Sequence, residues 1–124
     1  MRLKLPLDDE KFHWTKHSKE KMQQYHLSEK RVKRVLRKPN RVEEGIAPNT
    51  IALMEITGTK KHPTEIWVMY QIANEKRKMK SIKQKKLRII SAWRYPARSP
   101  LGKLPPIPED TLAELEKIIK ANYN

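Results

Sequence analysis

The chain has 124 residues and a formal net charge of +14, from 28 lysines and arginines against 14 aspartates and glutamates. This length predicts one domain with its own core, while the lack of both a roughly 20-residue apolar run and a secretory h-region indicates a cytoplasmic protein. There is no cysteine and the four histidines lack zinc-site spacing, so we expect neither a metal nor another cofactor.

The positive charge is concentrated in two segments. Residues 16–41 carry ten lysines and arginines against two acids, and residues 76–103 carry eleven and no acid. If the two segments converge in the fold, their field attracts a polyanion. Nucleic acid fits best, because displacing counterions from phosphates supplies affinity. An anionic membrane surface fits less well, because these segments lack a clean apolar face, and an acidic protein partner is a third option.

Residues 1–11 are predicted to be an irregular lead-in, with alternating Leu3, Leu5 and Leu7 as a candidate edge strand. Phe12 and Trp14 are apolar enough to dock on the core.

A first helix is predicted from Thr15, a favourable N-cap, to about Gln24. Its residues His17, Lys21 and Tyr25 are spaced to share one stripe. A histidine and a lysine one turn apart, near a helix N-terminus, could both address an anion. The simpler interpretation is that both lie on an exposed surface.

A second helix is predicted to begin after the N-cap Ser28 and to end before Pro39. Val32, Val35 and Leu36 give it one narrow buried face. Its other face is basic and consists of Lys30, Arg31, Lys33, Arg34, Arg37 and Lys38. A run of charged residues like this usually faces solvent, and the alternative interpretation is that these side chains contact phosphates.

Period-two patterns predict strands over residues 41–44, 50–57, 64–72 and 86–95, with the last two antiparallel. The strand over residues 64–72 is apolar on both faces, which is typical of a central strand. Between the last two strands, the basic residues 73–85 fit either a loop or a distorted strand.

The strand over residues 86–95 reads KLRIISAWRY. Strict alternation divides it into two faces. One face is predicted to carry Leu87, Ile89, Ser91, Trp93 and Tyr95. The other is predicted to carry Lys86, Arg88, Ile90, Ala92 and Arg94. At about 3.3 Å per residue, Arg88 and Arg94 lie roughly 20 Å apart and could contact different phosphates of one polyanion.

Residues 96–108 hold five of the nine prolines and are predicted to form an extended connector. Residues 109–122 are predicted to form a terminal helix that folds back on the same domain, with docking on a partner as the less favoured alternative. The expected fold is α+β, with two N-terminal helices packed on a small, mostly antiparallel sheet of about three to five strands. Residues 1–98 form the main unit, and residues 99–124 add the connector and last helix.

Two stretches resemble a known group of proteins. The segment FHWTKHSKEKMQQYHLSEKRV resembles the N-terminal helix pair of BrnT-type toxins of the RelE superfamily, and also a related uncharacterised family with the pattern HAxxRMxxRGIS. The strand LRIISAWRY resembles the RIISARR of BrnT-type toxins. The resemblance covers residues 12–98 and implies a RelE-like fold. Lys21, Tyr25 and Trp93 stand where these patterns have arginines.

The resemblance implies a small ribonuclease toxin that cleaves RNA, including ribosome-associated mRNA, and is neutralised by an antitoxin protein. Such enzymes need no metal, because a base activates the ribose 2′-hydroxyl to attack the adjacent phosphate. His17 is the candidate acid or base, supported by Lys21. Arg94 and Arg88 would stabilise the phosphate, and Tyr95 would donate a hydrogen bond or stack on a base. This assignment requires His17, Lys21 and Arg94 on one side of the fold.

The alternative is a non-catalytic nucleic-acid-binding module on the same fold, which needs only a continuous basic surface. The residues predicted to bind nucleic acid in either case are Lys80, Lys83, Lys85, Lys86, Arg88, Arg34 and Arg37.

Overall fold

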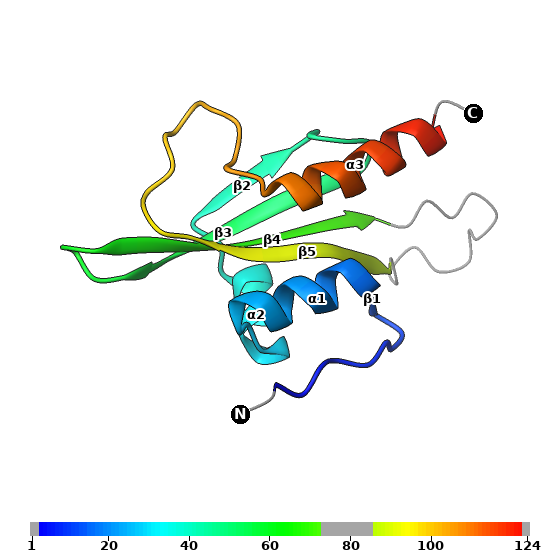
Figure 1. The fold of residues 1–124 in the computed structure, drawn as a ribbon, viewed down its shortest axis with the longest axis horizontal. Coiled ribbons are helices and arrows are strands. Elements are labelled where there is room, and N and C mark those ends of the chain that lie inside the picture. The colour runs from blue at the N-terminus through cyan, green and yellow to red at the C-terminus, as the bar shows by residue number, and fades with distance from the viewer. Residues whose placement is uncertain (1–2, 73–85, 123–124) are drawn as a thin grey trace.

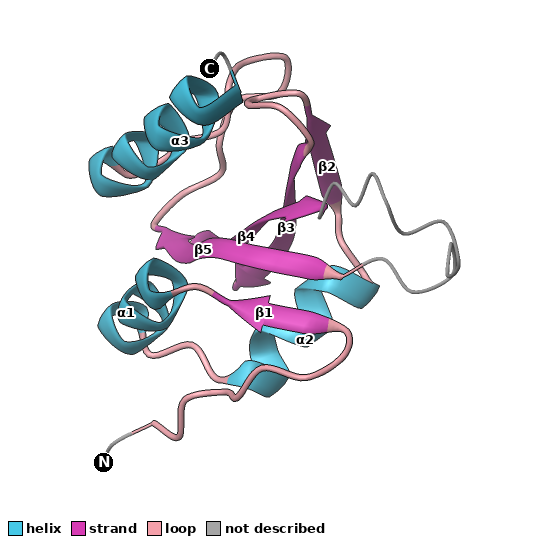
Figure 2. Cartoon of the chain, turned by 90° about the vertical axis from the view of Figure 1, so that its right-hand side faces the viewer, coloured by secondary structure: helices cyan, strands magenta, loops and turns pink. Residues whose placement is uncertain are grey.

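The computed structural model describes residues 3–72 and 86–122, which form a five-stranded sheet with helices on both faces (Figures 1 and 2). The elements in chain order are β1 (Phe12–Trp14), α1 (Lys16–Tyr25), α2 (Glu29–Arg37), β2 (Arg41–Glu44), β3 (Thr50–Gly58), β4 (Pro63–Ile72), β5 (Leu87–Tyr95) and α3 (Glu109–Asn122). The sheet order is β1-β5-β4-β3-β2, with β1 parallel to β5 and every other pair antiparallel. The predicted α+β class is confirmed.

Each face of the sheet carries its own hydrophobic cluster. Helices α1 and α2 lie on one face, which we call the α1/α2 face, and its buried residues include Met22 and Val68. Helix α3 lies over the opposite face, the α3 face (Figure 2). There Trp67 and Trp93 stack with ring centroids 6.0 Å apart, and Leu115 of α3 is only 3% exposed. The C-terminal helix therefore folds back on this domain.

The first two helices begin where their capping residues predict. The Thr15 hydroxyl accepts a hydrogen bond from the Ser18 amide at 3.0 Å, and the Ser28 hydroxyl accepts one from the Arg31 amide at 3.1 Å. Each bond satisfies one backbone donor that the helix itself leaves unpaired. Helix α1 ends at His26, whose φ of 56° is left-handed and turns the chain toward α2.

The predicted edge strand within residues 3–7 is wrong, and the strand lies further along the chain as β1. Pro6 has no amide donor for a ladder. Immediately before β1, the Asp9 carboxylate accepts hydrogen bonds from the amides of Lys11 and Phe12 at 2.8 and 2.7 Å, which forms a turn. Phe12 then pairs with Leu87 at the start of β5.

The predicted division of β5 into two faces is also wrong, because the strand contains a bulge. Met69 of β4 pairs with Ser91 and Tyr70 pairs with Ile89, so Ile90 has no partner in β4. A bulge of this kind inserts one extra residue and resets the alternation of side chains. As a result, the α3 face carries Arg88, Ile90, Ser91, Trp93 and Tyr95, and the α1/α2 face carries Leu87, Ile89, Ala92 and Arg94.

A buried polar network fastens the proline-rich connector to the sheet. Glu65 of β4 has no exposed surface, and its carboxylate accepts hydrogen bonds from the Trp67 indole at 2.9 Å and from the Ser99 amide and hydroxyl at 2.9 and 2.8 Å. The Arg98 guanidinium lies 3.5 Å from the same carboxylate. Arg41 donates to the Ser99 hydroxyl at 2.9 Å. The connector is therefore held by hydrogen bonds to buried groups rather than by apolar contacts alone.

Candidate nucleic-acid interface

A polar cluster forms where α1, β5 and the first turn of α3 meet. Lys21 is only 3% exposed, and its ammonium donates to both carboxylate oxygens of Asp110 at 3.0 and 3.1 Å and to the Gln24 amide oxygen at 3.0 Å. Partial burial raises the pKa of the Asp110 carboxyl, but the hydrogen bonds and charge of Lys21 outweigh this effect and hold the pKa below its usual value. Lys21 therefore pairs with the protein's own C-terminal helix.

His17 takes part in the same cluster. Its Nε2 lies 3.1 Å from the Thr111 hydroxyl, which in turn lies 2.8 Å from the Ser91 hydroxyl. Thr111 and Ser91 are both fully buried. The chain of three side chains joins α1, α3 and β5, and α3 covers the hydroxyls that a substrate would need to reach.

Arg94 lies away from this cluster. It is on the α1/α2 face, where its Nε donates to the Tyr25 carbonyl at 2.9 Å and its Nη2 lies 3.5 Å from the His26 carbonyl. These carbonyls end α1, so Arg94 stabilises the C-terminus of that helix. Tyr95 packs against the hydrophobic cluster of the opposite face, the α3 face. Of the four residues predicted to be catalytic, the fold brings His17 and Lys21 into one cluster and turns Arg94 to the other face, and no hydrogen bond of the described structure joins Tyr95 to that cluster.

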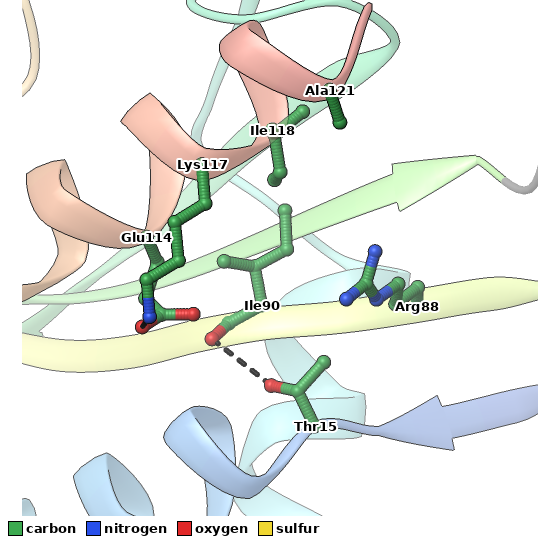
Figure 3. A pocket seen from close by; sticks show the side chains of 7 residues that line it. All are labelled: Thr15, Arg88, Ile90, Glu114, Lys117, Ile118 and Ala121. Carbon is green, nitrogen blue, oxygen red and sulfur yellow. Dashed lines mark hydrogen bonds and ion pairs between the residues drawn. The ribbon is translucent and has the colours of Figure 1, made fainter.

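The clearest concave feature on the α3 face is a pocket between β5 and the second half of α3 (Figure 3). Its volume is about 180 Å³. It is lined by Thr15, Arg88, Ile90, Glu114, Lys117, Ile118 and Ala121. We call it the Arg88 pocket, because the exposed Arg88 guanidinium stands at its edge. Among the described residues, the hydrogen-bond partner of that guanidinium is the Gln71 amide oxygen at 3.4 Å. No described carboxylate neutralises it.

The exposed end of β5 adds further positive charge. Lys86 precedes the strand and is exposed, and the Leu87 amide donates to the Lys11 carbonyl at 2.9 Å, which places Lys11 beside it. Hydrogen bonds from the Phe12 and Lys11 amides hold the pKa of the Asp9 carboxyl below its usual value, and the charge of Lys86 contributes to this effect, so Asp9 offsets part of the local positive charge. Lys80, Lys83 and Lys85, which were predicted to bind nucleic acid, lie outside the described residues.

The basic face of α2 is partly neutralised. The Arg34 and Arg31 guanidinium groups lie 3.0 and 3.9 Å from the carboxylate of Glu55, a residue of β3 that is only 8% exposed. Arg37 is exposed and has no ion pair in the described part of the chain. Of the two predicted binding residues on α2, Arg37 is therefore free to meet a ligand and Arg34 is engaged within the fold.

Several residues of these sites carried no signal in the sequence. Asp110 fits the first turn of any helix, and Ser91 and Thr111 have no distinctive spacing. Their roles depend on contacts with residues about 20 to 90 positions away. Within residues 3–72 and 86–122, no group of three or more histidines and carboxylates could hold a metal ion. None of the described helices has the length and apolar character needed to cross a membrane.

Comparisons with protein-family models, with curated proteins and with solved structures found no match to this chain.

Proposed function

We propose that this chain is a small RNA-binding protein that contacts RNA through the start of β5 and the Arg88 pocket. The carrying observation is that the Arg88 guanidinium is exposed there without a neutralising carboxylate in the described structure, and that the neighbouring Lys86 is also exposed. Exposed cationic side chains can replace the counterions of phosphates, which supplies affinity to RNA or DNA. A net charge of +14 strengthens the field that attracts such a ligand.

The fold class that we propose is RelE-like and closest to the BrnT-type toxins, on the strength of the sequence resemblance over residues 12–98. The order of two helices followed by antiparallel strands agrees with that proposal. On this view the RNA includes ribosome-associated mRNA, and an antitoxin protein is the natural partner.

Metal-independent RNA cleavage is the second candidate function, and one observation favours it. His17, Thr111 and Ser91 are joined by hydrogen bonds beside the ion pair of Lys21 with Asp110. Cleavage would use His17 to take the proton of a ribose 2′-hydroxyl as its oxygen attacks the adjacent phosphorus and the 5′-oxygen leaves. Binding alone is the better-supported function, because Arg94 lies elsewhere and α3 covers the hydroxyls.

A matched pair of variants tests the proposal. Arg88→Ala and Arg94→Ala remove the same charge from the same strand but from opposite faces. Binding of single-stranded RNA is measured by fluorescence anisotropy over a range of salt, with chelator present, and cleavage is followed in the same samples. Arg88→Ala is expected to weaken binding about fivefold, or about 1 kcal/mol, and to lower the slope of log affinity against log salt by about 0.7.

Arg94→Ala is expected to leave the RNA affinity and its salt dependence nearly unchanged. Equal losses in the two variants would refute the assignment of RNA binding to the α3 face. Cleavage by the wild type that disappears in a His17→Ala variant, with binding retained, would establish the second candidate instead. No binding at low salt would refute the RNA-binding proposal altogether.

A further inference from the structure

We propose that the Arg88 pocket holds a single unstacked base of the bound RNA strand, with Arg88 contacting an adjoining phosphate. This inference rests on the proposed RNA-binding function and adds a specific site to it. Figure 3 shows the pocket between α3 and β5, with the side chains of Ile90 and Ile118 facing each other and the Arg88 guanidinium beside them.

The size of the pocket limits what it can take. An engineered apolar cavity of roughly 150 Å³ in another protein accommodates benzene, so about 180 Å³ is enough for one six-membered ring. Ile90, Ile118 and Ala121 provide apolar walls for the faces of such a ring. Sequence-selective binding of single-stranded RNA commonly places an unstacked base in a pocket of this kind.

The polar groups at the edge of the pocket can meet the edge of a base. The Lys117 ammonium lies 3.1 Å from a carboxylate oxygen of Glu114. This pair places a donor and an acceptor side by side, and the Watson–Crick edge of every base carries both an acceptor and a donor. Because Lys117 neutralises Glu114, the pocket keeps the net positive charge of Arg88, which favours the phosphate next to the base.

The walls of the pocket are fixed in place before any ligand binds. The Thr15 hydroxyl donates to the Ile89 carbonyl at 2.8 Å, which fastens the start of α1 to β5. The α3 wall is anchored one turn earlier by Leu115, which is buried against the sheet. A site held by these contacts loses little conformational freedom when a base enters.

The first experiment titrates the full-length wild-type protein with hexauridylate and follows its methyl resonances by NMR. The resonances of Ile90 and Ile118 are expected to shift, whereas that of Ile56 on the β3–β4 hairpin does not. Unshifted Ile90 and Ile118 resonances at saturation would overturn the inference without relying on any variant.

The second experiment fills the pocket without changing its charge. Ala121→Phe places a ring in the space proposed for the base, and Ala113→Phe makes the same change at an exposed position of α3 outside the pocket. Thermal unfolding checks that both variants keep α3 docked. Ala121→Phe is expected to weaken hexauridylate binding about tenfold, and Ala113→Phe is expected to leave it unchanged.

The outcomes separate this inference from the proposed function. If RNA binds with a steep salt dependence but the Ile90 and Ile118 resonances do not shift and the two phenylalanine variants bind alike, the pocket inference fails and the RNA-binding proposal stands. If the wild type does not bind hexauridylate at low salt, both fail.

Discussion

Replacing Glu65 with alanine tests how much of the stability depends on the network beneath the connector. In the described structure, the Glu65 carboxylate is the acceptor of both the Ser99 amide and the Trp67 indole N–H, which lie in buried surroundings, and the change removes it. Leaving a buried donor without a partner costs about 1–3 kcal/mol, so two such donors predict a loss of about 4 kcal/mol. A domain of this size has a total stability of about 5–15 kcal/mol, and the variant is therefore expected to be close to unfolding.

Urea denaturation followed by tryptophan fluorescence measures this loss. The matched control is Glu44→Ala, which removes the same side chain from an exposed position of β2 and is expected to change the free energy of unfolding by at most about 0.5 kcal/mol. A Glu65→Ala variant that loses less than about 1 kcal/mol would refute the reasoning, because it would mean that water or a rearranged connector satisfies both donors.

Three further changes address α1, α3 and the β3–β4 turn. Arg94→Ala is expected to lower the free energy of unfolding by at most about 1 kcal/mol, because its bonds to the end of α1 are exposed; a larger loss in urea titrations would show a deeper role. The lowered pKa of Asp110 makes its pairing with Lys21 stabilising above the carboxyl's ordinary pKa of 3.8, and this contribution is lost as pH falls through the lower folded-state value. Asp110→Asn should therefore flatten the acid side of the curve of unfolding free energy against pH, and an unchanged curve would count against the pair. Gly58→Ala is expected to destabilise by more than about 1 kcal/mol, because φ is +82° and the new Cβ would lie 2.4 Å from the His62 carbonyl oxygen; a melting temperature equal to that of the wild type would contradict this geometry.

Local chemistry made the secondary structure predictable. Thr15 and Ser28 marked helix starts, and Pro39 marked a helix end, because capping and helix breaking depend only on neighbouring residues. The helices and the four longer strands accordingly lie within about a residue of the predicted ranges. The three-residue strand β1 was missed, because it is defined by pairing with β5 and not by its own pattern.

The arrangement of the candidate site could not be predicted in the same way. A single unpaired residue, Ile90, moves Arg88 and Arg94 to opposite faces of the sheet, and nothing in the string RIISAW marks a bulge. The stripe of His17 and Lys21 was correctly placed on one side of α1, but the sequence did not indicate that Asp110 and Thr111 would meet it. Contacts between distant segments decide which charges remain available to a ligand.

The parallel pairing of β1 with β5 sets the order in which the protein can form during synthesis. The Thr15 hydroxyl is bonded to a residue 74 positions later in the chain, and ribosomes add roughly 5–20 residues per second. Helix α1 therefore waits roughly 4 to 15 s for the strand on which it packs. Helix α1 has ten residues, which is too short to be stable alone. The nascent N-terminal segment consequently exposes the side chains of Met22 and Leu27 until β5 emerges, a period in which a chaperone would find a binding site that the finished protein no longer offers.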